Sequence, residues 1–475
     1  FAPDEEIVFQ SNNADKHRAA AHRLLEEGKA YRDFTPKEAP TDANVKDAIK
    51  QRAREQGADK NMRDNPYREL AKDESDARAA AGEPFAIRLK VPAEGRTAFD
   101  DQVYGLQERD YADTEDLVLL RSDGHPLYNL AVVCDDIEME ITHVIRGQDH
   151  LTNTHKQVLI YEALGAEPPV FAHLPLIMAP NKGKLSKRKH GEVVSMTTYR
   201  DAGFVAAAFR NFLALLGWSA GEEKEIYSME ELIEKFSLDG IHRSNAVFNF
   251  SQDDPRKWTD DKAIWMNAEY IRTMPLDGLY PLVKAELKTN KLWKDEYADD
   301  IPEPANGLEL IAKSYTANSP IDSTAWFLYT VDLIRQRFFT LKDFSSQGRA
   351  YFSEDFDFDP AAIAKNLTKF LDLKEWMPEL ADRFESEFQN SPPYEGGVDA
   401  ASGGRGGSLP FDEANIESVV KAFTEEKGTK LGVIMNGART LLTGVAVGPS
   451  MLSVFEVIGL ERTLMRLRSQ VAWNS

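Results

Sequence analysis

One stretch constrains the fold of this chain more than any other: "ITHVIRGQDHLTNTHKQVLIYEALG", residues 141–165. A β-branched run precedes Gly147, and the residues after this turn have the composition of a helix. We expect Thr152 or Asn153 to cap that helix and Gly165 to end it. A buried strand, a turn and a helix in this order are typical of a parallel α/β unit, in which ligands bind at the carboxyl ends of the strands.

The flanking segments extend this pattern. "EPFAIRLKVP" predicts a strand that ends at its proline, and "FAHLPLIMAP" is another short apolar segment. "DLVLLRSDGHPLYNLAVVCDD" contains two apolar runs around a polar turn, and we interpret both runs as strands. Nearer the N-terminus, a helix is predicted from Asn12 or Asn13 to Gly28. After Glu192 nearly every segment predicts a helix.

Composition bounds the class of protein. The 475 residues correspond to about three domains. The 57 Lys and Arg against 78 Asp and Glu give a net charge of −21, which argues against non-specific coating of nucleic acid but allows a local basic track. A single cysteine, Cys134, excludes an internal disulfide and a multi-cysteine zinc site, and fits a reducing, cytosolic setting. We expect neither a membrane span nor a leader, because no sufficiently long apolar run occurs.

The loop "PNKGKLSKRKHGE" concentrates cations in this acidic chain. Lys184 and Lys187 flank Ser186 directly after a predicted strand. Such a loop is suited to a polyphosphate, since mobile ammonium groups can follow charge as it develops in a transition state. The simpler alternative is a solvated basic turn, and short basic runs of that kind are common.

Two further groups of residues are candidates for binding. Arg146 ends the "ITHVI" strand, where an arginine can hold a carboxylate; the alternative is a surface ion pair with Asp149 or Asp135. Tyr128, in "PLYNLAVV", is on its own more typical of a core aromatic than of a ligand contact. The histidines show neither triad spacing nor metal-ligand spacing.

Taken together, "PLYNLAVVCDDIEMEITHVIRGQDHLTNTHKQVLIYEALG", "FAHLPLIMAPNKGKLSKRKHG" and "LLGWS" resemble the bacterial-type glutamyl-tRNA synthetases, which are class I aminoacyl-tRNA synthetases. "EGKAYRDFTP", "AAGEPFAIRLKVP", "WMNAEYI", "RFFTLKDF", "KLGVIMNGARTLLTG" and "FEVIGLERTLMRL" extend the resemblance over nearly the whole chain. "KLSKR" alone is a weak signal, whereas "IRGQDHLTNT" followed at this distance by "HLPLIM" and "KLSKRKHG" is highly specific.

The resemblance implies an α/β fold: a Rossmann-like parallel-sheet catalytic domain with an inserted acceptor-binding domain, followed by all-helical stem-contact and anticodon-binding domains. The implied boundaries are 1–31 and 118–190 for the catalytic domain, 32–117 for the insertion, 191–320 for the stem-contact domain and 321–475 for the anticodon-binding region. The implied protein is a cytoplasmic monomer with no membrane partner.

The implied reaction joins L-glutamate to the 3′ end of tRNA(Glu) through a glutamyl-adenylate, with ATP and Mg²⁺. Residues that match family positions are Lys184, Ser186 and Lys187 in the catalytic signature loop, Lys187, Asp149 and His150 for ATP, Tyr128 and Arg146 for glutamate, and Arg335 and Arg337 in the anticodon-binding region. No zinc site is expected, since the insertion lacks the cysteines that some members use. The sequence leaves open whether tRNA(Gln) is also charged.

The sequence departs from the family pattern at its start. The family opens with a strand like "RFAPSPTG" and then a "HIGH"-type signature, whereas this chain runs from "FAP" straight into "DEEIVFQSN". We therefore expect Pro3 and Asp4 not to be consecutive in the natural chain. Segments 251–261 and 391–410 are longer than is usual in the family, and the second carries the glycine-rich "GGRGG".

Three alternatives remain at this stage. A glutaminyl-tRNA synthetase would carry β-barrels in its C-terminal region, where this sequence predicts helices. The shorter relative that modifies an anticodon base lacks such a C-terminal half. An inactive tRNA-binding paralogue is suggested by the missing signature.

Overall fold

The computed structural model describes residues 7–35, 65–251, 258–301, 306–389 and 409–474. The chain divides into two compact units, each of which we describe by itself. Unit 1 contains residues 1–184, 214–225 and 230–247, and unit 2 contains residues 185–213, 226–229 and 248–475. The Pro3–Asp4 junction, the glycine-rich stretch up to residue 408 and residues 252–257 lie outside the described residues.

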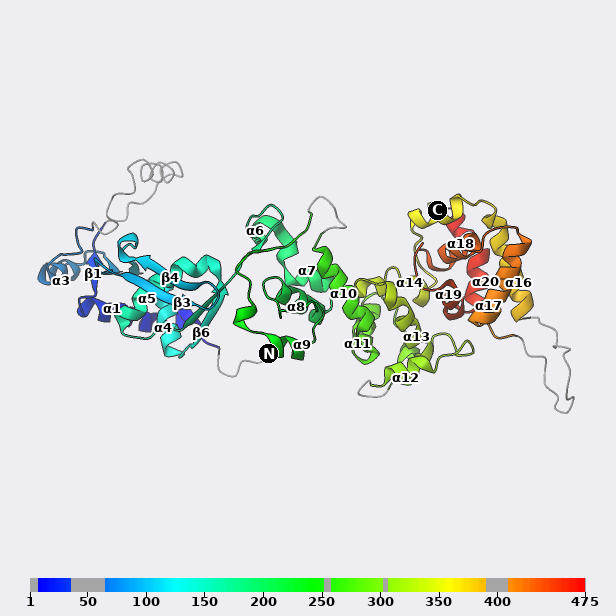
Figure 1. Cartoon of the computed structure of the whole chain (residues 1–475), viewed down its shortest axis with the longest axis horizontal. Helices are drawn as coiled ribbons and strands as arrows, with labels where there is room; N and C mark the ends of the chain where they lie inside the picture. The colour runs from blue at the N-terminus through cyan, green and yellow to red at the C-terminus, as the bar shows by residue number, and fades with distance from the viewer. Residues whose placement is uncertain (1–6, 36–64, 252–257, 302–305, 390–408, 475) are drawn as a thin grey trace. The chain divides into compact units, whose positions relative to one another are not determined.

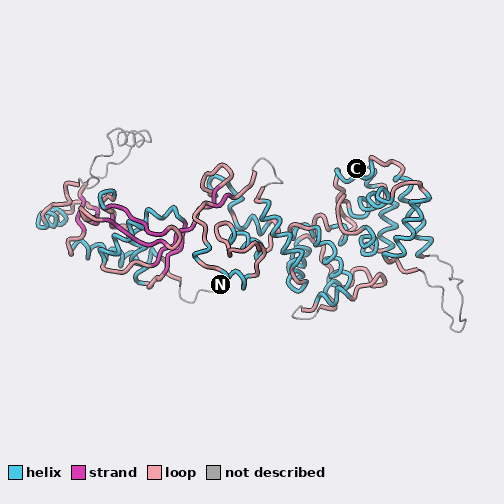
Figure 2. The backbone as a smooth tube through the Cα atoms, in the orientation of Figure 1, coloured by secondary structure: helices cyan, strands magenta, loops and turns pink. Residues whose placement is uncertain are grey.

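Unit 1 is built on a mixed four-stranded sheet. In spatial order its strands are β4 (Gly105–Asp110), β3 (Arg96–Asp101), β7 (Val170–Leu174) and β6 (His143–Gly147). β3 and β4 form an antiparallel hairpin, whereas β7 runs parallel to both β3 and β6. Strands β3, β4 and β6 are labelled in Figure 1, and the strands are drawn in magenta in Figure 2. The predicted "ITHVI" strand is therefore confirmed, and the apolar segment "FAHLPLIMAP" supplies its parallel neighbour.

Helix α5 (Leu151–Leu164) packs on β3 of this sheet, and α4 (Tyr128–Glu138) packs on α5 (Figure 1). Helix α1 (Ala14–Glu26) packs on α4 and on the second sheet of this unit. Their apolar residues pack with Phe99 of β3 and Phe171 of β7 in one core. Burial of this apolar surface, at about 25 cal/mol per Å², is what holds the helices to the sheet.

Helix α4 corrects one prediction, because the run "LYNLAVVCDD" is a helix and not a strand. Leu130 and Val133 are fully buried, and Cys134 packs beside them. That spacing of three and four residues is the helical period, and it outweighed the strand propensity of the two valines.

The helix boundaries were predicted in part. Gly165 ends α5 with a left-handed φ of 72°, as expected of a glycine at this position. The expected caps Thr152 and Asn153 are wrong, because a 3₁₀ turn over Gln148–His150 leads into the helix and His150 takes the cap position. The first helix begins after Asn13, as predicted.

A second, antiparallel sheet in unit 1 joins β1 (Ala30–Asp33), β2 (Ala86–Leu89) and β5 (Val118–Leu120). β2 confirms the strand predicted in "EPFAIRLKVP". Strands β3 and β4 fall inside the predicted insertion 32–117, yet they share the sheet of β6 and β7. The domain boundaries themselves stay a prediction. Unit 1 also holds α3 (Lys72–Ala80), all of α9 (Met229–Lys235) except its first residue, and the short parallel pair β8 (Ile177–Met178) and β9 (Ala246–Val247).

From residue 248 onward every named element in the described residues is helical, as the sequence predicted. The helices of this part are α10 (Asp261–Thr273), α11 (Leu276–Thr289), α12 (Leu308–Lys313), α13 (Thr324–Ile334), α14 (Arg349–Phe352), α15 (Pro360–Ile363), α16 (Leu373–Phe388), α17 (Glu413–Glu426), α18 (Leu431–Thr443), α19 (Met451–Ile458), α20 (Leu460–Arg468) and α21 (Val471–Asn474). They are preceded by α6 (Lys187–His190), α7 (Met196–Asp201) and α8 (Ala206–Leu215). None of the described helices is long and apolar enough to cross a membrane.

Candidate active site

Arg146 lies near the carboxyl end of β6, and its guanidinium is held by side chains of α5 and β7. Nη2 donates to Thr154 Oγ1 and to Gln157 Oε1, each at 2.7 Å, and Nε donates to His173 Nε2 at 3.3 Å. The guanidinium carbon also lies 6.0 Å from the centre of the Phe171 ring. Burial lowers the pKa of Arg146, opposed by the nearby Tyr128 and Asp136, and the group remains a cation at neutral pH.

The alternative interpretation of Arg146 as part of a surface ion pair is wrong. Asp149 pairs instead with Lys184, at 2.5 Å, and Asp135 accepts from His17 at 2.7 Å. Thr154 and Gln157 bind Nη2 and His173 contacts Nε, while Tyr128 is a further hydrogen-bonding neighbour of the guanidinium. A cation held in this way beside an exposed tyrosine can bind a carboxylate ligand.

Tyr128 begins α4 and is 47% exposed, so the interpretation as a core aromatic is wrong. It lies close enough to Arg146 to raise the pKa of that guanidinium, and its ring centre is 6.2 Å from that of His150. The structure thus brings Tyr128, Arg146 and His150 together within unit 1. The hydroxyl group of the exposed Tyr128, beside the Arg146 cation, can contact a small polar ligand.

Carboxylates and amides surround this group. Gln157 Nε2 donates to Asn129 Oδ1 at 3.3 Å, and Tyr161 Oη donates to Asp136 Oδ2 at 3.2 Å. Burial raises the pKa of Asp136, and it also raises the pKa of the lone Cys134 thiol to about 12. The thiol therefore stays protonated at neutral pH and is no nucleophile.

The basic loop begins in unit 1, directly after β8. The backbone N–H of Ala179 donates to the carbonyl oxygen of Gly183 at 2.8 Å and closes a tight turn. After this turn Lys184 forms an antiparallel β-bridge with Met178. Lys184 Nζ donates to Asp149 Oδ2, and this bond lowers the pKa of Asp149. Both side chains are partly exposed, so the pair is screened by water and contributes little to stability. It does place a lysine of the loop beside the turn that follows β6.

Ser186 and Lys187 belong to unit 2. Ser186 takes the cap position before α6, and its backbone N–H donates to His190 Nδ1 at 3.1 Å. Lys187 is the first residue of α6. Lys187 and Arg146 lie in different units, and their roles in binding ATP and glutamate stay predictions.

Arg335 and Arg337 end helix α13 in a 3₁₀ turn. The guanidinium of Arg335 already has protein partners: it donates a hydrogen bond to Met274 O and forms an ion pair with Asp332, each at 2.5 Å. Arg337 is exposed. The pKa of Arg439 is lowered by its burial and also by the positive charge of the nearby Arg337. Of the two predicted arginines, Arg337 is therefore the one available to a ligand.

Sequence reasoning missed the three residues that bind Arg146, which are Thr154, Gln157 and His173, and it missed Asp101, which binds His173. Thr154 and Gln157 are buried and three residues apart on α5, so polar residues on the buried face of a predicted helix were a usable signal. Asp101 and His173 gave no signal in the sequence, because they meet only through the pairing of β3 with β7.

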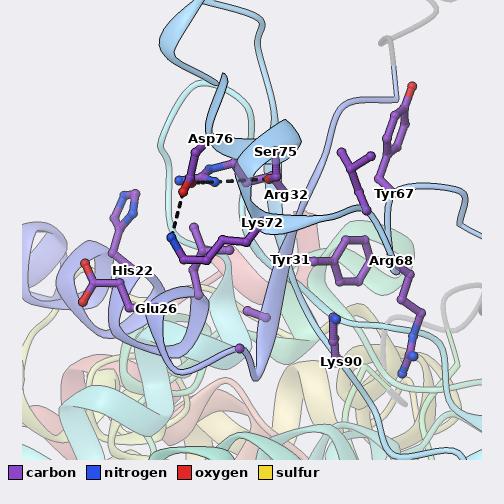
Figure 3. Close-up of a pocket in the computed structure, with 14 residues that line it drawn as sticks. His22, Glu26, Tyr31, Arg32, Tyr67, Arg68, Lys72, Ser75, Asp76 and Lys90 are labelled. Atoms are coloured by element: carbon purple, nitrogen blue, oxygen red, sulfur yellow. Dashed lines mark hydrogen bonds and ion pairs between the residues drawn. The ribbon is translucent and has the colours of Figure 1, made fainter. Parts of the chain in front are cut away.

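A separate cavity of about 180 Å³ lies between α1, β1 and α3 (Figure 3). Its cationic side chains are Arg32, Arg68, Lys72 and Lys90. Asp76 pairs with Arg32 at 2.5 Å and with Lys72 at 2.7 Å, as the dashed lines in Figure 3 show. Lys90 makes no side-chain hydrogen bond or ion pair within the described residues.

Comparisons with known proteins define the class. The model of the family "tRNA synthetases class I (E and Q), catalytic domain" matches residues 1–252, and that of the "Anticodon binding domain" matches residues 407–471. A parallel βαβ unit with a fixed arginine at the strand end, followed by a basic loop, accords with such a catalytic domain. The chain thus has the catalytic domain of a class I aminoacyl-tRNA synthetase.

The particular family follows from the relatives. The glutamate–tRNA ligase of Desulfotalea psychrophila is 40% identical over 98% of this chain and 84% of its own length. Glutamate–tRNA ligase 2 of Koribacter versatilis is 39% identical, covering 98% of this chain and 83% of that protein. The crystal structure of a glutamate tRNA ligase from Elizabethkingia meningosepticum, in complex with its amino acid, matches with a TM-score of 0.72 at 27% identity, over 98% of this chain and 85% of that one. This chain belongs to the glutamate–tRNA ligase family.

Proposed function

We propose that this enzyme attaches L-glutamate to the 3′ end of tRNA(Glu), using ATP. The observation that carries the proposal is the Arg146 guanidinium, held by Thr154 and Gln157 beside the exposed Tyr128, in a chain of this family. Such a site can hold a carboxylate of glutamate. The helical C-terminal part does not fit the glutaminyl-tRNA synthetase alternative.

The chemistry has two steps. In the first, a glutamate carboxylate oxygen attacks the α-phosphate of ATP, and pyrophosphate leaves with the electrons of the broken P–O bond. In the second, a terminal ribose hydroxyl of the tRNA attacks the acyl carbon, and AMP leaves. The protein contributes positioning and charge stabilisation. Arg146 and Tyr128 orient glutamate, whereas Lys184, Ser186, Lys187, Asp149 and His150 contact ATP.

Mg²⁺ enters this proposal together with ATP. The described residues contain no group of three His, Cys, Asp or Glu side chains that could hold a metal. Mg²⁺ commonly binds through substrate phosphates and one or two carboxylates, and Asp149 is a carboxylate beside the loop. We further propose that the enzyme is a cytoplasmic monomer without a zinc site.

The function is tested by glutamate-dependent exchange of pyrophosphate into ATP, with the full-length protein, in the presence and absence of tRNA. We expect exchange with glutamate and much less with glutamine. Charging of purified tRNA(Glu) and tRNA(Gln) then defines the tRNA substrate. Absence of exchange under both conditions would favour the inactive paralogue.

The Lys187→Ala variant is expected to lower the kcat of exchange about 100-fold, because a cation that follows the developing phosphate charge is lost. Its KM for glutamate should change little, since Lys187 is assigned to ATP. Steady-state exchange at varied glutamate and ATP concentrations measures both constants. Arg200→Ala, at an exposed arginine paired with Asp201, is the control and should behave as wild type. Equal kcat values for the two variants would remove Lys187 from the mechanism.

We propose that the acceptor end of the tRNA contacts the cationic cavity beside α1 and α3. Within the described residues Lys90 offers an unpaired cation there, and the half-buried Tyr67 offers an aromatic ring, whereas Arg32 and Arg68 are already paired with Asp76 and Asp116. Phosphates and unstacked bases are bound by this combination of side chains. The anticodon end is proposed to contact Arg337 and Arg439, the second of which lies inside the region matched by the anticodon-binding domain.

Replacing Lys90 by Gln is expected to raise the KM for tRNA about 3- to 10-fold, because one contact between a half-buried cation and a phosphate, worth ~1 kcal/mol, is lost. The KM values for ATP and glutamate should stay unchanged. Lys16→Gln, at an exposed lysine paired with Glu138, is the matched control. If both variants charge tRNA like the wild type across a salt titration, the acceptor end binds elsewhere.

A further inference from the structure

Asp101 ends strand β3 and is 1% exposed, yet its carboxylate is fully hydrogen-bonded. Oδ1 accepts from the backbone N–H groups of Val103 and Tyr104, at 3.0 and 2.9 Å. Oδ2 accepts from the backbone N–H of His173, at 3.1 Å, and lies 2.6 Å from His173 Nδ1. An ionised carboxylate only accepts hydrogen bonds, so the imidazole proton sits on Nδ1.

This tautomer determines what His173 presents to Arg146. With the proton on Nδ1, Nε2 carries a lone pair that lies 3.3 Å from Arg146 Nε and 3.0 Å from Thr154 Oγ1, so it can accept from either group. The other tautomer would direct an N–H against the N–H of a guanidinium. His173 is completely buried, and burial lowers its pKa, which favours the neutral ring that this contact requires.

The contact between His173 Nε2 and Arg146 Nε matters because the hydrogen bonds that side chains of α5 make to Arg146 are at a different nitrogen. Thr154 and Gln157 both bind the same nitrogen, Nη2, whereas His173 is the contact at a second nitrogen, Nε. A contact at a second nitrogen further restricts rotation of the guanidinium about Nη2. Because a carboxylate binds a guanidinium in its plane, loss of the contact at Nε is expected to misorient the group.

We propose that Asp101 and His173 form a positioning pair that orients Arg146 for the carboxylate of glutamate. The inference rests on the proposed function of Arg146 in glutamate binding. Both residues are buried, so they act through Arg146 and not by touching substrate.

The test is Asp101→Asn. Its amide oxygen can still accept from Val103 and Tyr104, and its NH₂ group then faces His173 Nδ1, which moves the ring proton to Nε2. We expect the KM for glutamate in pyrophosphate exchange to rise about 10- to 100-fold, with the KM for ATP unchanged. The matched control is Asp100→Asn, the same change at the exposed neighbour on β3, with no expected effect.

Two further measurements separate positioning from folding. Long-range ¹H–¹⁵N spectra of protein labelled at its nine histidines report the tautomer, and His173→Gln assigns the signal. We expect Nδ1–H in the wild type and Nε2–H in Asp101→Asn. In addition, His173→Gln keeps an acceptor oxygen near Arg146 and should retain more glutamate affinity than His173→Leu, which has none.

An Nε2–H tautomer in the wild type would overturn the proposal. So would an unchanged KM for glutamate in Asp101→Asn, or equal losses in His173→Gln and His173→Leu. These outcomes leave the proposed function intact if the wild type catalyses exchange. A wild type without glutamate-dependent exchange would instead overturn the proposed function, and with it the substrate role of the pair.

Discussion

Replacing Arg146 by Ala is expected to lower kcat/KM for glutamate about 1,000-fold, equivalent to ~4 kcal/mol of lost transition-state binding. The reason is that the substrate carboxylate loses its only proposed fixed cation. Thr154 and Gln157 lose their common partner in the same change, and buried polar groups left unpaired add to the cost. Pyrophosphate exchange at varied glutamate concentration measures this ratio.

Arg146→Lys is the informative companion. An ammonium cannot reach His173, Thr154 and Gln157 at once, so we expect a loss of about 100-fold even though the charge is kept. Arg121→Ala, at an exposed arginine paired with Asp123, controls for removal of any arginine. If Arg146→Lys were as active as the wild type, the planar hydrogen-bonding geometry would be irrelevant to glutamate binding.

The second large effect is expected on stability, from Gly444→Ala in unit 2. Gly444 follows helix α18 with a φ of 74°, and a Cβ atom there would stand 2.2 Å from the carbonyl oxygen of Asp357. The left-handed backbone alone costs a side chain about 1–2 kcal/mol, and a backbone clash raises the total to ~3 kcal/mol or more. The Gly444 carbonyl also accepts from Asp359 N–H at 2.8 Å, so the backbone has little room to move away.

The same helix offers a matched control. A Cβ atom added at Gly432, in the first turn of α18, would have no other atom within 4 Å. Gly432→Ala should therefore stabilise the protein by about 0.5–1 kcal/mol through helix propensity. Urea unfolding followed by far-UV circular dichroism compares the midpoints of both variants with the wild type. Equal midpoints for Gly444→Ala and Gly432→Ala would contradict the predicted strain.

Several elements were predictable from the residues alone because their signals are local. The strand, turn and helix of residues 141–165, the glycine that ends α5 and the helical C-terminal part each depend on neighbours within a few residues. Helix α4 was mistaken for a strand because two valines favour a strand locally, whereas the helical spacing of Leu130, Val133 and Cys134 shows the face that is buried.

The sequence by itself determined the family, the reaction to be expected and the residues expected to meet substrate, because those residues sit in contiguous motifs whose order is specific. Only the tertiary structure decided what holds Arg146 in place. Asp101, on β3, and His173, on β7, are 72 residues apart and meet through strand pairing. Contacts of that kind are set by sheet register and burial, which short-range patterns of residues do not encode.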